Sequence, residues 1–123
     1  HKHRRRQRQM CIRDRRCVHE PGGTAPMARI PGITTCGKTG TVENFKIVNG
    51  RLIKKPNHSV FIAFAPMDNP KIAIAVFVEN TGGGGGTWAA PIASLVMEKY
   101  LNGEVESEAK EKRILDAKLS LWK

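Results

Sequence analysis

The residues with the clearest chemical potential lie in one short stretch, Cys36-Gly37-Lys38-Thr39-Gly40-Thr41. Two patterns overlap there. Counted from Gly32, the stretch fits the phosphate-loop pattern G-x-x-x-x-G-K-[ST]. Counted from Lys38, it is a Lys-Thr-Gly triplet, whose ammonium and hydroxyl groups could bind a carboxylate if the segment is extended. The flanking residues have to distinguish these two chemistries.

The flanks favour an extended strand over residues 33–42. A phosphate loop needs a buried strand before it and a helix after it. Upstream, however, Pro26 and Pro31 interrupt strand pairing, and downstream Gly40-Thr41-Val42 is a poor first turn for a helix. β-Branched residues instead fill the segment, and Gly40 would let a peptide lie close beside it. A nucleotide site at Gly32–Thr39 remains the alternative.

The net charge of +10 suggests a nucleic-acid ligand until the charges are located. Residues 1–16 hold eight Lys or Arg against Asp14, whereas the other residues hold thirteen basic and ten acidic side chains. The segment resembles translated sequencing-adapter read-through, so we interpret residues 1–16 as non-native and disordered. The alternative is an RNA-binding module that uses this arginine-rich arm.

The cysteines and the hydropathy give little further evidence of function. Cys11, Cys17 and Cys36 have no metal-ligand spacing, and we expect Cys36 to be a buried packing residue. We therefore predict no metal and no cofactor. No apolar stretch reaches the roughly 18 residues that a membrane span needs, and no secretory signal is visible.

Apolar runs predict three antiparallel strands, at 33–42, 59–65 and 71–79. Residues 43–57 are polar and turn-prone, with Asn49-Gly50 as a hairpin signal. Beyond the glycine run 82–86, Thr87 is the predicted N-cap of a helix that ends at Asn102-Gly103 and covers one sheet face. A charged helix follows over 104–123. The fold class is therefore mixed α/β (α+β).

Residues 17 to about 105 resemble the carboxy-terminal end of class B penicillin-binding proteins, the elongation-type D,D-transpeptidases called penicillin-binding protein 2. The order and spacing of the matching stretches are those of the family. These stretches are Gly22-Gly23-Thr24-Ala25, Ile30-Pro31-Gly32-Ile33, Gly37-Lys38-Thr39-Gly40-Thr41, Glu43-Asn44, His58-Ser59, Phe61-Ile62-Ala63-Phe64-Ala65-Pro66, Asp68-Asn69-Pro70-Lys71-Ile72-Ala73, Val78-Glu79-Asn80, the glycine run, and Ala89-Ala90-Pro91-Ile92-Ala93.

The resemblance implies part of a penicillin-binding transpeptidase, or serine β-lactamase-like, fold. It also implies an enzyme that crosslinks peptidoglycan stem peptides through a serine acyl-enzyme, with D-Ala-D-Ala peptides and β-lactams as ligands. Lys38 is then the lysine of the third catalytic motif, and Thr39, Gly40 and Thr41 bind substrate. The glycine run would end beside the substrate groove, although from the residues alone it reads as a flexible connector. His58 matches a frequent family histidine, yet we expect it at an exposed loop end.

The family's other two motifs, S-x-x-K and S-x-N, are missing from the region before Lys38, so the chain lacks the catalytic serine. The matches Ser107-Glu108-Ala109-Lys110 and Ser120-Leu121-Trp122-Lys123 follow Lys38 in a charged tail where we expect no pocket. We therefore predict that the chain is an inactive fragment of the enzyme. Residues 17–105 would be the carboxy-terminal part of the transpeptidase domain, and residues 106–123 a helical extension.

For the complete protein, the resemblance implies an inner-membrane location on the periplasmic face, with the anchor in a missing amino-terminal part. A polymerising glycosyltransferase of the elongation machinery is the implied partner, and no nucleic acid is expected.

Overall fold

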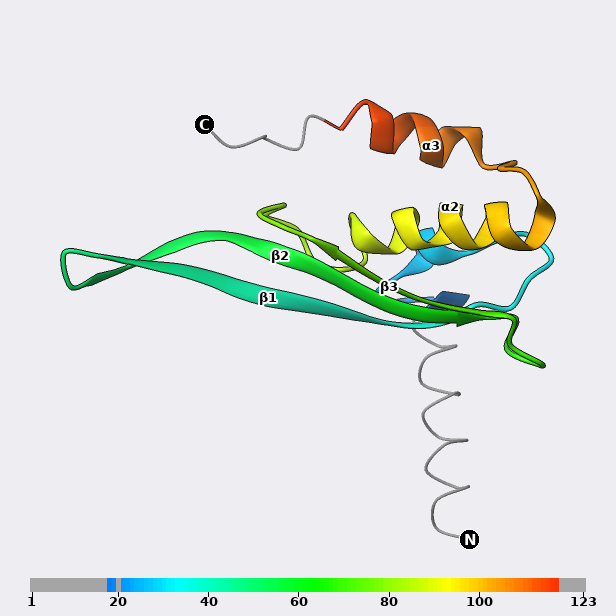
Figure 1. Ribbon diagram of the computed structural model, residues 1–123, viewed down its shortest axis with the longest axis horizontal. Helices are drawn as coiled ribbons and strands as arrows, with labels where there is room; N and C mark the ends of the chain where they lie inside the picture. Colours follow the sequence, from blue (N-terminus) through cyan, green and yellow to red (C-terminus); the bar gives the residue numbers. More distant parts are fainter. Residues whose placement is uncertain (1–17, 20, 118–123) are drawn as a thin grey trace, which may run out of the picture.

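The computed structural model describes residues 18–19 and 21–117, which form three layers. An antiparallel sheet is covered on one face by helix α2, and helix α3 lies over α2 (Figure 1). The elements are η1 (Pro26–Ala28), β1 (Cys36–Val48), β2 (Arg51–Ala65), β3 (Ile72–Val78), α2 (Ala89–Asn102) and α3 (Glu108–Leu115). The predicted mixed fold, with its antiparallel strands and covering helix, is therefore confirmed. The predictions for residues 1–16 and for the end of the charged tail, 118–123, lie outside the described residues.

The sheet has the order β1-β2-β3, and β1 and β2 form a hairpin longer than the sequence suggested. Pairing between them runs from Cys36 opposite Phe64 to Val48 opposite Arg51. The prediction that residues 43–57 are non-strand was wrong, apart from the turn. Asn49 and Gly50 have φ angles of 51° and 74°, which match the type I′ turn of a two-residue hairpin. This turn lets the ladder between the two arms continue from Asn44 and Lys55 to Val48 and Arg51.

A β-bulge explains how Pro56 fits inside β2. Val42 pairs with His58 and Asn44 pairs with Lys55, so two residues of β2, Pro56 and Asn57, oppose the single residue Glu43. Proline has no N–H to give to the ladder, and a bulge is one of the few strand positions that tolerate it. His58 therefore lies inside β2 and is half-buried, which corrects the prediction of an exposed loop end.

The core lies between the sheet and α2. β2 turns its alternate residues toward the helix, and the largest of them, Phe61, is fully buried. Small side chains on the facing side of α2 let the helix approach the sheet closely; the buried set on α2 is Ala89, Ala90, Pro91, Ala93, Ser94, Met97 and Glu98. The other sheet face stays open among the described residues, and Ile62 and Phe77 are each 54% exposed there.

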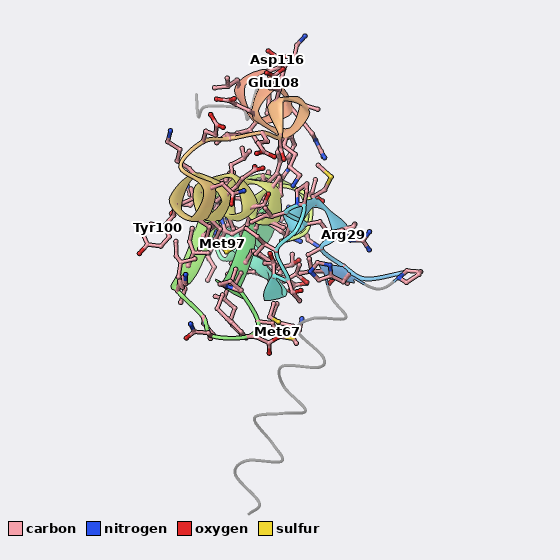
Figure 2. All side chains as sticks on the ribbon, turned by 90° about the vertical axis from the view of Figure 1, so that its right-hand side faces the viewer. Arg29, Met67, Met97, Tyr100, Glu108 and Asp116 are labelled. Carbon is pink, nitrogen blue, oxygen red and sulfur yellow. The ribbon has the colours of Figure 1, made fainter. Side chains whose placement is uncertain are left out.

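The ends and exposed side of α2 show which sequence signals were correct. Gly103 ends the helix with φ 80°, as predicted, and Pro91 lies in its first turn. Thr87 is not the N-cap, because the helix begins at Ala89 after Trp88 and has no side-chain cap from either neighbour. Met97 is fully buried, whereas Tyr100 is 64% exposed and points outward (Figure 2).

Helix α3 is shorter than the predicted segment 104–123 and is attached to α2 mainly by polar contacts. Ser107 Oγ donates to Glu98 Oε1 at 3.2 Å, and Lys110 Nζ donates to Ser94 Oγ at 2.9 Å. The guanidinium of Arg113 lies 5.6 Å from the ring centroid of Trp88, within cation–π range. No residue of α3 is buried, so these contacts rather than a packed apolar face hold the helix in place.

Candidate functional site

The Lys-Thr-Gly triplet lies in the first half of strand β1. Cys36 opens the strand and is fully buried, as predicted, and Lys38 to Thr41 follow in extended backbone paired with β2. No helix begins near Thr39, since β1 continues to Val48. A phosphate loop requires such a helix, so the structure is incompatible with the nucleotide-site interpretation of Gly32–Thr39.

The side chains of Lys38, Thr39 and Thr41 divide between the two faces of the sheet because successive strand residues alternate. Thr39 and Thr41 pair with Phe61 and Ser59, which face α2. Lys38 lies opposite Ile62, on the open face.

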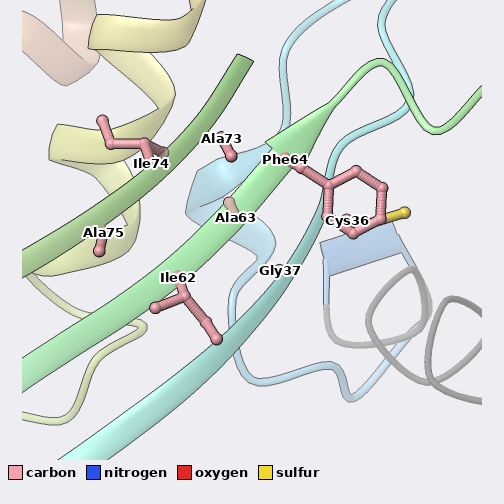
Figure 3. A pocket seen from close by; sticks show the side chains of 8 residues that line it. All are labelled: Cys36, Gly37, Ile62, Ala63, Phe64, Ala73, Ile74 and Ala75. Carbon is pink, nitrogen blue, oxygen red and sulfur yellow. The ribbon is translucent and has the colours of Figure 1, made fainter. Parts of the chain in front are cut away.

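Lys38 is exposed, and its Nζ donates to the carbonyl oxygen of Thr39 at 2.9 Å. On the same open face, a shallow apolar cavity of about 380 Å³ lies where the three strands run side by side (Figure 3). The residues that line it are Cys36, Gly37, Ile62, Ala63, Phe64, Ala73, Ile74 and Ala75. The lysine ammonium therefore borders an uncovered apolar surface. Among the described residues, no Asp or Glu forms an ion pair with it.

Thr39 is held from the α2 side by the segment before η1. Its Oγ1 lies 2.9 Å from the Oγ1 of Thr24, at hydrogen-bond distance. Thr24 is not among the site residues predicted from the sequence, although it belongs to the stretch Gly22–Ala25, which resembles the family. Nothing in the local pattern indicates that a residue fifteen positions earlier reaches the strand.

The glycine run packs directly on the same part of β1. A Cβ placed on Gly84 would lie 3.2 Å from Thr41 Oγ1. A Cβ on Gly85 would lie 1.9 Å from the carbonyl oxygen of Val60 and 2.8 Å from that of Gly40. The absence of side chains is thus required for this close approach. The glycine run is therefore a packed loop beside the triplet, as the family resemblance implied, and not a flexible connector.

Strand β1 has a partner on one side only within the described part of the chain, because it is an edge strand of the sheet. An edge strand presents unpaired N–H and C=O groups with which an extended peptide can form a further ladder. The segment from Lys38 to Thr41 thus combines an accessible edge, an ammonium group on one face and two hydroxyl groups on the other. This arrangement suits a peptide ligand that carries a carboxylate.

The comparison with protein families now decides the identity of the fold. Residues 15–98 match the model of the penicillin binding protein transpeptidase domain, which is more than half of the chain. The chain belongs to this family. The resemblance seen in the sequence is thereby confirmed.

Curated relatives include peptidoglycan D,D-transpeptidases. The chain is 44% identical over 73 residues to MrdA of Haemophilus influenzae and 43% identical over 79 residues to PbpA of Mycobacterium tuberculosis. These alignments cover 54% and 61% of this chain, but only 11% and 15% of the two relatives. The chain therefore spans a small part of the proteins that it matches.

Solved structures of the same family share the fold. Penicillin-binding protein A of M. tuberculosis, in a ceftriaxone acyl-enzyme complex, matches with a TM-score of 0.56 at 36% identity, over 74% of this chain and 20% of that one. Penicillin-binding protein 2 of Pseudomonas aeruginosa matches with a TM-score of 0.54 at 33% identity, over 76% and 19%. The three-stranded sheet with its helix is thus part of a penicillin-binding transpeptidase domain.

The S-x-x-K match at Ser107–Lys110 differs from our expectation in one respect. The tail does border a cavity, since Ser107 and Lys110 line a groove of about 640 Å³ with residues 29–34. The two polar groups are nevertheless bonded to Glu98 and Ser94, and Lys110 also donates to the carbonyl oxygen of Arg29. Desolvation lowers the pKa of Lys110, partly countered by the nearby Glu98 carboxylate. This lysine therefore anchors α3. The second match, Ser120–Lys123, lies outside the described residues.

No helix in the described part of the chain is long and apolar enough to cross a membrane. No three His, Cys, Asp or Glu side chains in residues 18–19 and 21–117 come together as a metal site would require.

Proposed function

We propose that this chain is the substrate-binding end of a peptidoglycan D,D-transpeptidase that crosslinks stem peptides through a serine acyl-enzyme. The observation that carries the proposal is the position of Lys38-Thr39-Gly40 on an extended edge strand, in a chain of the transpeptidase family. A D-Ala-D-Ala stem peptide would pair with the free edge of β1. Gly40 would leave room for its backbone, and Thr39 and Thr41 would bind its carboxylate.

Lys38 has the catalytic role in this proposal. Its ammonium group lies on the open sheet face, away from α2. If the part of the domain that carries S-x-x-K and S-x-N packs on that face, the ammonium would stand near the nucleophilic serine and the developing oxyanion. The chain contains no S-x-N, and its S-x-x-K matches lie after Lys38. We therefore propose that the chain alone neither crosslinks peptides nor forms an acyl-enzyme with a β-lactam.

The rest of the proposal concerns the complete protein. It would work at the periplasmic face of the inner membrane, anchored through a segment outside this chain, together with a polymerising glycosyltransferase. The similarity to MrdA, a peptidoglycan D,D-transpeptidase, supports the reaction type. The family resemblance supports the location and the partner.

Labelling with a fluorescent penicillin tests the proposal. The complete protein should form a covalent adduct that survives denaturing electrophoresis, and the 123-residue chain should not. Lys38→Ala should slow acylation of the complete protein about a hundred- to a thousandfold, since removing one group that stabilises a developing oxyanion costs about 10²–10³ in rate. The matched control is Lys46→Ala, because Lys46 is also exposed on β1 but lies toward the hairpin turn. Failure of the complete protein to label, or equal losses in the two variants, would contradict the proposal.

A further inference from the structure

A small polar cluster lies where the hairpin leaves the sheet, and it contains no residue of the triplet. His58 belongs to β2, Asn44 to β1, and Asn80 to the turn after β3. The backbone N–H of Asn80 donates to His58 Nδ1 at 3.0 Å. The side chain of Asn80 accepts from Asn44 Nδ2 through its Oδ1 at 2.7 Å. Asn80 is thereby bonded to a side chain of β1 and to a side chain of β2.

The backbone and ring geometry of Asn80 and His58 holds both residues of the cluster in place. Asn80 has φ 55°, a left-handed conformation that asparagine tolerates better than most residues. The His58 ring is half-buried against Phe77, with a centroid distance of 5.2 Å. Because Nδ1 accepts a hydrogen bond, the neutral imidazole carries its proton on Nε2. The adjacent bulge at Pro56–Asn57 gives β2 the local bend at which these side chains meet.

The cluster stands at the start of the glycine run. Directly after Asn80, Thr81 Oγ1 donates to the carbonyl oxygen of Asn57 at 3.3 Å, and Gly82 N donates to the same oxygen at 3.2 Å. Two residues later, Gly84 and Gly85 lie against Thr41 and Gly40. The chain between the cluster and the triplet is therefore only a few residues long, and it contacts β2 at its start.

We infer that His58 is a positioning residue. Through its bond to Asn80 it fixes how closely the glycine run approaches Gly40 and Thr41, the proposed substrate-binding residues. This inference rests on the proposed function. A run of glycines has little intrinsic preference for one conformation, so its position must come from its contacts with the rest of the chain. In the middle of the run, Ser59 Oγ donates to the carbonyl oxygen of Gly84 at 2.9 Å. At the start of the run, the bond from Asn80 to His58 acts together with the bonds of Thr81 and Gly82 to Asn57 as the anchor.

The test measures acylation of the complete protein by a fluorescent penicillin, at several concentrations. His58→Leu keeps an apolar contact with Phe77 but removes the acceptor, so the second-order acylation constant should fall about three- to tenfold, the value of one neutral hydrogen bond. His58→Asn can present a side-chain oxygen near the position of Nδ1 and should restore most of the rate. Asn44→Ala, which removes the other bond to Asn80, should give a smaller decrease in the same direction.

Hydrogen exchange of the 123-residue chain provides the second measurement. His58→Leu should increase amide exchange in residues 80–86, whereas His58→Asn should leave it close to the unmodified chain. If His58→Leu is too unstable to purify, Asn44→Ala supplies both measurements. Acylation that is unchanged in His58→Leu, or decreased equally in His58→Asn, would overturn the inference while leaving the proposed function in place. A complete protein that does not label at all would overturn both.

Discussion

Ser59 of β2 joins the glycine run to helix α2 through one buried hydroxyl group. Its Oγ donates to the carbonyl oxygen of Gly84 at 2.9 Å and accepts from the backbone N–H of Ala89 at 3.2 Å. The second bond satisfies one of the N–H groups that a helix leaves unpaired in its first turn. A strand residue thirty positions away thus performs the capping that the sequence suggested for Thr87.

Ser59→Ala should destabilise the chain by about 1–3 kcal/mol, because it removes the partner of the buried Ala89 N–H. Urea unfolding followed by circular dichroism measures the change. Thr87→Ala is the control, and as an exposed residue outside the helix it should stay within about 0.5 kcal/mol of the unmodified chain. A loss near 1 kcal/mol in Thr87→Ala, with none in Ser59→Ala, would show that Thr87 is the cap after all.

Gly85→Ala should destabilise the chain more than Gly84→Ala. The new methyl group at Gly85 would lie 1.9 Å from a backbone oxygen of β2, whereas the one at Gly84 would meet only the Thr41 hydroxyl at 3.2 Å. Backbone cannot move aside as easily as a side chain, so we expect about 3 kcal/mol or more for Gly85 and about 1 kcal/mol or less for Gly84. Thermal unfolding of the two variants measures the difference. Equal midpoints would mean that the glycine run does not lie against Val60.

Phe61→Ala should cost about 3–5 kcal/mol and bring this small chain close to complete unfolding. Phe61 is fully buried between β2 and α2, whereas Phe45 on the hairpin is 44% exposed. Phe45→Ala is therefore a matched control of the same chemistry, and it should cost clearly less. Denaturant titration of both variants gives the comparison. Similar losses would indicate that the hairpin buries its side chains as fully as the core does.

The stability of the chain relative to Lys110→Met should rise as the pH increases toward 10.5. Burial lowers the pKa of Lys110 from that ordinary value, so above its folded-state pKa the unfolded chain binds the proton that the folded chain has lost. Stability then increases with pH across this window, and the cost of burying the ammonium group is fully present below it. The neutral amine can still donate to Ser94.

Unfolding midpoints of the unmodified chain and of Lys110→Met are measured from pH 7 upward. The difference between them isolates Lys110, because the other titrating groups are the same in both proteins. Lys112→Met on the exposed side of α3 serves as the control and should show no such trend. A difference that falls with pH would mean that attraction to Glu98 outweighs the desolvation of Lys110.

The sequence by itself determined the local elements and the family. β-Branched residues around Lys38 predict an extended triplet, Asn49-Gly50 a tight hairpin turn, and Gly103 the end of α2, because these signals depend on backbone preferences within a few residues. The order and spacing of the motif stretches indicated the transpeptidase domain, because both can be read directly along the chain.

Only the tertiary structure decided which distant groups meet. Ser59 caps α2, Thr24 reaches Thr39, and Asn80 joins His58 through a bond between residues that are far apart in the chain. The strand character of 51–57 also depended on pairing, because a segment with Pro56 and three cations is stable as a strand only against β1 with a bulge. Such contacts arise from the packing of complete elements, and local preferences carry no information about them.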